Sequence, residues 1–171
     1  MTKPLNIIVA CAENRVIGRR GLLPWRIAED WKFFKQRTAG STVILGRISF
    51  ESWKSIHDEE RHAIVLTRNR NLAGPRVDVA DSLGAAIARA QALPNPIYIC
   101  GGQRIFEEAM TLPQVERLYL TLVHAEVEGD RSFPIWQHAF PYVLEQSEGA
   151  DLNYRYTFYT LGRAKAPPVA T

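Results

Sequence analysis

Short runs of β-branched and other apolar residues recur along the chain and predict the buried strands of a sheet. Between the early runs, apolar residues spaced three and four apart predict helices that pack on that sheet. The last two runs alternate aromatic and polar residues, which is typical of a hairpin. The predicted strands are 5–12, 42–45, 62–67, 77–80, 96–100, 115–123, 142–147 and 154–161, and the predicted helices are 26–38, 49–53, 83–93 and 103–110.

The order of these elements predicts the class of fold. Strands alternate with helices in the first part of the chain, whereas strands alone appear near its end. This order favours a single α/β domain with a mixed, mainly parallel sheet, flanking helices and an antiparallel C-terminal edge. We expect the domain to span residues 1–162 and residues 163–171 to form a flexible tail.

Composition narrows the class further. The chain has 171 residues, which suits one domain with a sizeable core. No apolar run approaches the roughly 20 residues that a membrane span needs. The apolar run near the N-terminus is too short for the core of a signal peptide, so we expect a cytoplasmic protein without a membrane partner.

The cysteine and histidine positions do not predict a metal site, and the net charge does not predict one particular kind of partner. Cys11 and Cys100 each lie in an apolar run, and buried free thiols are favoured over a disulfide in a cytosolic chain. The histidines are scattered, and no Cys/His spacing resembles a metal site, so no metal is expected. The net charge of +3 suits an anionic small molecule as well as nucleic acid.

One carboxylate stands on an apolar helix stripe. In the helix predicted over 26–38, Ile27, Trp31, Phe34 and Thr38 share one face, and Asp30 points with them. A carboxylate turned toward a core loses water and must find a donor or take up a proton. The alternative is structural, because a carboxylate in the first helical turn is stabilised by the helix dipole.

Three strands end in turns that suit a phosphorylated ligand. Gly46-Arg47, Thr67-Arg68 and the stretch Gly101–Arg104 each follow a predicted strand, and two of these turns open helices. Ligands of open α/β sheets bind beyond the carboxyl ends of strands, and helix N-termini offer free N–H groups to phosphate. Any one turn alone is also ordinary structural chemistry, and neither a G-x-G-x-x-G nor a Walker motif is present.

Taken in order, these stretches resemble dihydrofolate reductase of the bacterial type. The resemblance covers nearly the whole chain. It is carried by NRVIG (14–18), LPW (23–25), the helix with Asp30, VILGR with SFES (43–52), HAIVLT (62–67), the Gly-Gly pair, LYLT (118–121) and AEVEGDRSFP (125–134).

The resemblance implies reduction of 7,8-dihydrofolate to tetrahydrofolate by NADPH. Asp30 would pair with the amino and N3 side of the pterin ring, Thr121 would bond that carboxylate or the ligand's amino group, and Trp25 would hold a water. Ile8, Phe34 and Trp53 would line the substrate site. Arg61 would bind the α-carboxylate of the folate's glutamate tail. Leu23, on the loop 13–25, would lie near the reacting centre and help to exclude water.

The cofactor positions also follow from the resemblance. Ala10 and Ile17 would contact the nicotinamide. Gly101 and Gly102 would cradle the pyrophosphate with the residues up to Ile105, and the Gly101–Gly102 bond is cis in the family. Arg47 and Arg68 would meet the 2′-phosphate of NADPH. The remaining expected cofactor contacts are Gly46, Ile48, Ser49, Thr67, Cys100, Gln103, Arg104 and Ile105. The resemblance implies a monomer that binds dihydrofolate and antifolate inhibitors, with no nucleic-acid partner.

The sequence departs from the family pattern at several of these positions. Ile48 stands where a basic or imidazole side chain often helps to bind the 2′-phosphate, and Phe106 replaces a usual Tyr. Trp53 replaces a smaller apolar residue. The link HDEER (57–61) is one residue longer than usual and acidic, so we expect its charges to weaken the interaction of Arg61 with an anionic tail.

Two other functions share parts of this pattern. A riboflavin-pathway reductase of related fold, acting on a ribosylated pyrimidine, would need the same cofactor turns but not Asp30 together with Thr121 and Trp25. A basic nucleotide- or nucleic-acid-binding domain would account for the pI of about 9.0 and the loop arginines but leaves Asp30 unexplained.

Overall fold

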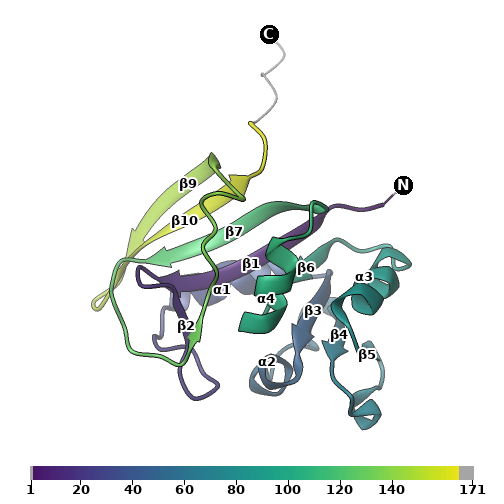
Figure 1. Cartoon of the computed structure of the whole chain (residues 1–171). Helices are drawn as coiled ribbons and strands as arrows, with labels where there is room; N and C mark the ends of the chain where they lie inside the picture. Colours follow the sequence, from purple (N-terminus) through teal and green to yellow (C-terminus); the bar gives the residue numbers. More distant parts are fainter. Residues whose placement is uncertain (1, 166–171) are drawn as a thin grey trace.

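A twisted sheet of eight strands runs through the protein (Figure 1). The computed structural model describes residues 2–165. The strand order is β5-β4-β3-β6-β1-β7-β10-β9, with parallel pairing from β5 through to β7 and antiparallel pairing of β7, β10 and β9. The strands are β1 (Leu5–Ala12), β3 (Thr42–Gly46), β4 (His62–Leu66), β5 (Val77–Ala80), β6 (Ile97–Ile99), β7 (Val115–Val123), β9 (Tyr142–Ala150) and β10 (Arg155–Gly162). The predicted mixed sheet with an antiparallel C-terminal edge is confirmed.

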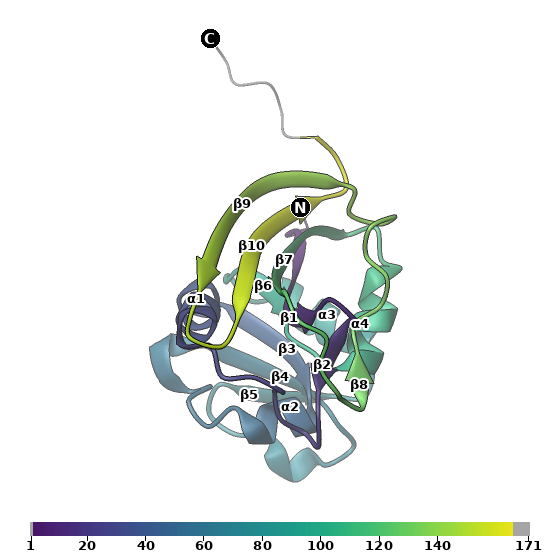
Figure 2. The same ribbon diagram turned by 90° about the vertical axis from the view of Figure 1, so that its left-hand side faces the viewer.

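Helices cover both faces of this sheet, α1 lying on one side and α3 and α4 on the other (Figure 2). Their bounds are α1 (Ala28–Thr38), α2 (Arg47–Ser52), α3 (Leu83–Gln91) and α4 (Gln103–Met110), with short 3₁₀ turns at Asp58–Glu60 and Arg70–Leu72. Ser82 is the residue that caps α3, since its hydroxyl accepts a hydrogen bond from the Ala85 N–H at 3.1 Å.

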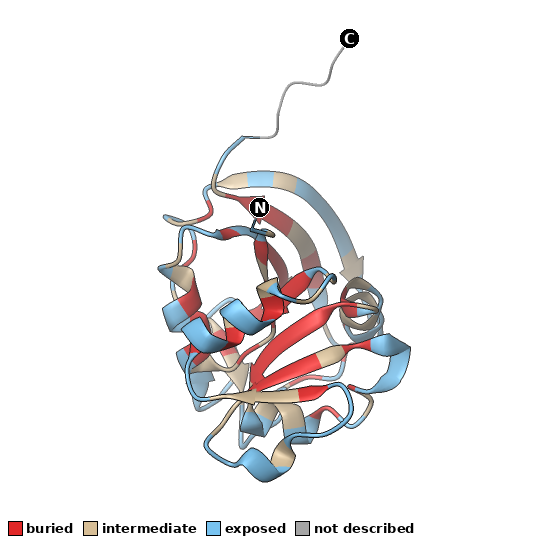
Figure 3. Ribbon diagram, turned by 90° about the vertical axis from the view of Figure 1, so that its right-hand side faces the viewer, coloured by how far each residue is buried: buried red, intermediate tan, exposed pale blue. Residues whose placement is uncertain are grey.

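The side chains of β1 pack into two separate parts of the hydrophobic core, one on each face of the sheet. Ile7, Val9 and Cys11 pack into the cluster beneath α3 and α4, whereas Ile8 turns to the opposite face with residues of α1 and α2. This follows from the twofold alternation of side chains along a strand. The central strands are therefore buried on both faces, as Figure 3 shows, which explains their continuous apolar sequences.

Several features differ from the sequence prediction. Helix α2 begins at Arg47 rather than at residue 49, and β9 continues to Ala150 rather than ending at residue 147. Helix α1 begins at Ala28 rather than at residue 26, because Ile27 has extended backbone angles and stands as its N-cap. A second sheet of two short strands, β2 (Val16–Gly18) and β8 (Arg131–Ser132), was not predicted. Strands of two and three residues leave too little periodicity to be recognised in a sequence.

The start of the predicted tail is attached to the domain. The Arg163 guanidinium donates hydrogen bonds to the backbone oxygens of Val115, Met110 and Leu112, and it stacks on Phe140. Residue 163 therefore belongs to the packed structure, while residues 166–171 of the predicted tail lie outside the described part of the chain. No helix within residues 2–165 has the length and apolar character required to cross a membrane.

A substitution at Gly129 tests the packing around the two-stranded sheet of β2 and β8. A Cβ at this position would lie 2.5 Å from the Gly18 carbonyl oxygen, which is backbone and has little room to move. We expect Gly129→Ala to lower the free energy of unfolding by about 1–3 kcal/mol through overpacking. Denaturant unfolding measures this. Gly74→Ala is the matched control, because nothing lies within 4 Å of its added methyl; equal stability of the two variants would contradict the packing argument.

Candidate active site

The early end of β6 opens a cavity in the sheet. β6 pairs with Leu5–Ile7 of β1 but ends at Ile99, so β1 from Ile8 onward keeps a strand partner only on its β7 side. Beyond Ile99 the chain turns through Gly101, whose carbonyl oxygen accepts a hydrogen bond from the Gly46 N–H at 2.9 Å. The resulting cavity has a volume of about 1410 Å³. This exceeds the roughly 300–1,000 Å³ of a typical single-ligand pocket and leaves room for two ligands.

The cavity brings together all but one of the catalytic, substrate-binding and cofactor-binding residues that the sequence predicts. It receives side chains or backbone from β1, α1, the ends of β3, β4 and β6, the start of α4, and β7. The predicted residues that line it are Ile8, Ala10, Ile17, Leu23, Trp25, Asp30, Phe34, Gly46, Arg47, Ile48, Ser49, Trp53, Thr67, Arg68, Cys100, Gly101, Gly102, Gln103, Arg104, Ile105 and Thr121. The exception is Arg61.

Asp30 is a buried acid at one end of the cavity. Only 7% of its surface is exposed, and burial raises its pKa to about 6, while hydrogen bonding to the Thr121 side chain acts in the opposite direction. Thr121 reaches this place from β7, where it is paired with Ala10 of β1. The buried indole N–H of Trp25 has no hydrogen-bond partner within residues 2–165, so it is a donor that a ligand or a water can use.

Aromatic rings form the wall next to Asp30. The Phe34 and Trp53 ring centroids are 4.8 Å apart, and the Trp31 ring stacks on Phe34 at 5.6 Å. Trp31 lies on the predicted apolar stripe but is 41% exposed, because that stripe faces the cavity as well as the core. These rings and the Asp30 carboxylate line the same cavity, a combination that suits a flat heterocycle with polar groups at its edge.

The opposite end of the cavity presents free backbone donors. The Gly101–Gly102 peptide bond is cis, and Gly101 has φ of +120°, which only glycine adopts readily. Helix α4 starts directly afterwards at Gln103, and its N-cap, Gly102, offers no capping side chain. The first N–H groups of α4 therefore remain available to an anion, and the helix dipole favours a negative charge there.

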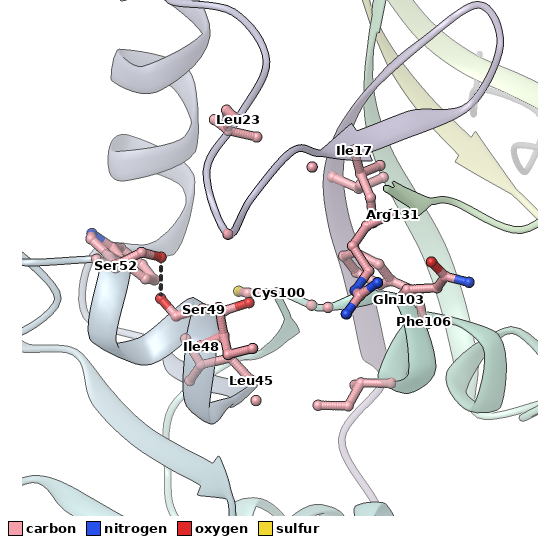
Figure 4. A pocket seen from close by; sticks show the side chains of 18 of the residues that line it. Ile17, Leu23, Leu45, Ile48, Ser49, Ser52, Cys100, Gln103, Phe106 and Arg131 are labelled. Carbon is pink, nitrogen blue, oxygen red and sulfur yellow. Dashed lines mark hydrogen bonds between the residues drawn. The ribbon is translucent and has the colours of Figure 1, made fainter. Parts of the chain in front are cut away.

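Arginines surround this end. Arg47 forms an ion pair with Glu51 at 3.0 Å, whereas Arg68 has no ion pair in the described part of the chain. Arg131 was missed in the sequence, although it lies in the stretch AEVEGDRSFP; it lies on the Gln103 side of the cavity, facing Ile48 and Ser49 (Figure 4). Arg20 also lines the cavity and was missed. A basic residue in a loop gives no sign in the sequence of the direction in which it points.

Arg61 lies behind the cavity wall. Its side chain has no exposed surface, its guanidinium lies 4.9 Å from the Trp53 ring centroid, and it forms an ion pair with Glu59 at 2.6 Å. It does not line the cavity, and its expected contact with a ligand carboxylate stays a prediction.

The two cysteines are free thiols. Cys11 is buried, and burial raises its pKa to about 12. Cys100 was expected to be buried but is partly exposed and lines the cavity, because β6 ends one residue before it. Burial against its neighbours still raises the pKa of the Cys100 thiol.

Comparisons with known proteins agree with this geometry. The family model of dihydrofolate reductase matches residues 4–163. Dihydrofolate reductase type 3 of Salmonella typhimurium is 37% identical over 164 residues, which cover 94% of this chain and 99% of the relative. The enzyme of Staphylococcus haemolyticus is 37% identical over 131 residues, covering 77% of this chain and 76% of the relative. A structure of Enterococcus faecalis dihydrofolate reductase with NADP(H) and RAB-propyl superposes with a TM-score of 0.83 at 31% identity, covering 96% of this chain and all of that one.

Fold, cavity and comparisons define the class as a nicotinamide-dependent oxidoreductase. The chain belongs to the dihydrofolate reductase family. It is an enzyme that reduces dihydrofolate with NADPH. The free N-terminus of α4, the glycine turn and Arg68, which forms no ion pair within residues 2–165, fit the phosphates of that cofactor.

Because Asp30 is buried, the free energy of unfolding should depend on its ionisation. Its folded pKa of about 6 lies above its ordinary value of 3.8, so its contribution to stability is complete below pH 3.8 and falls as the pH rises through about 6. Asp30→Asn removes this loss. We expect the variant to be more stable than the parent by about 2–3 kcal/mol at about pH 8 and to lose that advantage near pH 4.

Denaturant unfolding across this pH range measures the effect. Asp81→Asn is the control, because Asp81 also lines the cavity but is exposed to solvent, so it removes a carboxylate from the cavity without removing a buried one. A pH-independent difference for Asp30→Asn would show that the carboxylate is not destabilised by its burial.

Proposed function

We propose that dihydrofolate binds with its pterin ring against Asp30 and the aromatic wall, and that NADPH lies across the strand ends toward α4. A hydride then passes to pterin C6, and N5 is protonated. The observation that carries this proposal is the joint presence of Asp30, Thr121 and Trp25 in the same cavity as the glycine turn. A pyrimidine reductase would need the turn but not these three side chains.

Asp30 orients the substrate. Its carboxylate accepts two parallel N–H donors from the amino and N3 edge of the pterin, a charge-assisted pair that is strong in a water-poor site. The same pair fixes the ring in its plane, with C6 turned toward the nicotinamide side. Thr121 holds the carboxylate or donates to the ligand, and Trp25 holds a water at the ring. Ile8 and Phe34 pack on the ring faces.

Protonation of N5 does not require direct contact with Asp30. The carboxyl pairs with the opposite edge of the ring, so we propose that water delivers the proton while Asp30 sets the local field. Its raised pKa of about 6 lies near the operating range that general acid–base chemistry requires. Leu23, half exposed on the loop 13–25, closes over the reacting atoms and limits entry of further water.

The chain's own groups bind the cofactor at defined places. When bound, NADPH supplies the hydride, and the protein supplies position and electrostatics. Ala10 and Ile17 contact the nicotinamide, and the start of α4 receives the pyrophosphate. Arg68, which has no ion pair among the described residues, receives the 2′-phosphate, while Arg47 shares its charge with Glu51. Arg131 adds a positive charge beside Gln103.

We also propose a cytoplasmic monomer that binds antifolates in the pterin site. All the proposed groups come from one chain and line one cavity, so no second copy is needed to complete it. The two free thiols are typical of a reducing compartment.

The proposal is tested by following NADPH oxidation by the purified protein with and without dihydrofolate, and again with methotrexate. Oxidation should depend on dihydrofolate and stop when methotrexate is added. Binding of NADPH without reduction of dihydrofolate would remove the pterin assignment and leave the pyrimidine substrate as the better one.

Asp30→Asn tests the role of the carboxylate in turnover. The amide cannot accept a charge-assisted pair or influence protonation of N5, so we expect kcat at neutral pH to fall about 10²–10⁴-fold. Activity should partly recover at low pH, where protonated substrate is available. Steady-state rates across the pH range measure this. Unchanged turnover at neutral pH would exclude Asp30 from the mechanism.

Arg68→Ala tests cofactor choice. Loss of one charged hydrogen-bond donor to the 2′-phosphate should reduce the preference for NADPH over NADH about tenfold, with little change in the KM for dihydrofolate. Arg70→Ala is the control, because Arg70 is an exposed residue of the same loop and does not line the cavity. If both variants keep the parental preference, the role belongs to Arg47 or another residue.

A further inference from the structure

Glu59 forms an ion pair with Arg61, a buried arginine next to the aromatic wall of the cavity. Its carboxylate oxygen lies 2.6 Å from Nη2 of Arg61, whose side chain has no exposed surface, whereas 41% of the Glu59 side chain is exposed. Glu59 is thus the part of this ion pair that solvent reaches. The acidic turn that carries it, Asp58–Glu60, follows Trp53 of the aromatic wall.

The donors of Arg61 are almost all in use. Nε–H donates to the Thr38 hydroxyl at 3.0 Å, Nη1 to the Asp58 carbonyl oxygen at 2.7 Å, and Nη2 to the Lys35 carbonyl oxygen and Glu59 at 2.6 Å each. A guanidinium has five N–H donors, so one on Nη1 is left. An external carboxylate that binds in the two-pronged manner needs two donors, so it must displace one of these acceptors. Lys35 and Asp58 contribute backbone carbonyl oxygens, whereas Glu59 contributes a partly exposed side chain that can turn away into water.

The place of Arg61 connects it with the substrate. Its guanidinium lies over Trp53, and two of its acceptors, Lys35 and Thr38, belong to α1, the helix that carries Asp30 and Phe34. Dihydrofolate has a pterin at one end and a negatively charged glutamate at the other. With the pterin on Asp30, a substrate tail that runs along the Phe34–Trp53 wall leads toward Arg61, the buried cation that contacts Trp53.

We propose that Glu59 is a specificity-determining residue, an internal carboxylate that competes with the substrate's glutamate tail for Arg61. Binding of the tail carboxylate breaks the Glu59–Arg61 ion pair and releases Glu59 to water. The competition weakens binding of ligands that carry the carboxylate tail and leaves binding of ligands without it unchanged. Compared with a variant that lacks Glu59, the enzyme therefore discriminates less strongly in favour of ligands that carry the carboxylate tail. This inference rests on the proposed placement of the pterin at Asp30.

Glu59→Gln removes the competing charge but keeps a side chain that can accept from Arg61. We expect the KM for dihydrofolate to fall about fivefold, with kcat unchanged. A change of this size corresponds to the binding free energy of one partly exposed ion pair. The KM for 7,8-dihydrobiopterin, which has the pterin but no glutamate, should stay the same. Binding should show the same split, with tighter methotrexate and unchanged affinity for a 2,4-diaminopyrimidine inhibitor that lacks a carboxylate.

Two further variants complete the test. Glu60→Gln removes the same charge from the same turn, and Glu60 forms no ion pair within the described residues, so it should leave every ratio at the parental value. Glu59→Gly removes the whole side chain at a position where φ is 59°, a conformation that glycine adopts readily, and should reproduce the effect of Glu59→Gln.

The outcomes separate this inference from the proposed function. Equal effects of Glu59→Gln and Glu60→Gln, equal effects on ligands with and without the tail, or no effect would overturn the role of Glu59. If NADPH oxidation by the parent protein did not depend on dihydrofolate, the substrate assignment would be overturned instead. The affinity for methotrexate would then show no dependence on Glu59.

Discussion

The buried carboxyl group of Asp30 is the constraint on which the rest of the active site depends. A carboxylate with 7% exposure is costly to ionise, and its pKa rises to about 6 as a result. A folded chain keeps such a group where a ligand repays the cost, and the amino and N3 edge of a pterin provides two matching donors. Thr121 from β7 and Trp25 from the loop before α1 line the same cavity as Asp30. We therefore propose that this one position sets the orientation of the substrate.

The position of that carboxylate relative to the cofactor follows from the sheet. Because β6 ends at Ile99 while β1 continues to Ala12, the sheet opens beyond Ile8, and the chain after β6 turns back through Gly101 and Gly102 into α4. The same opening therefore has an acid at one end and free helix N–H groups at the other. Hydride transfer needs two flat rings in contact, and a single break in the sheet provides adjoining places for them. In the proposed placement of the substrate, the acidic turn carrying Glu59 lies beyond the aromatic wall, where we propose that its ion pair with Arg61 affects the substrate tail and not the reacting ring.

Much of this arrangement could be predicted from the sequence because it depends on local patterns. The strands around the cavity are apolar on both faces, and Asp30 is noticeable because it interrupts an apolar helix stripe. The glycine turns follow strands, so the rule for open α/β sheets places them at one edge. The pairing of β2 with β8 could not be predicted, since two- and three-residue strands carry no period. The orientation of Arg131 and the burial of Arg61 depend on contacts between segments far apart in the chain, and Arg61 in particular is determined by α1 and the Asp58–Glu60 turn together.

The ionisation of Asp30 in the ligand-free protein is the most direct test of this account. Carbon-13 NMR of the aspartate carboxyl carbons, with Asp30→Asn used to assign the resonance, follows this group as pH changes. The account predicts a midpoint near the value of about 6 that burial confers, and loss of this titration from the accessible range when a 2,4-diaminopyrimidine inhibitor pairs with the carboxylate. A midpoint near the ordinary value of 3.8 would show that the carboxyl is well solvated, and it would contradict the central claim that its burial organises the site.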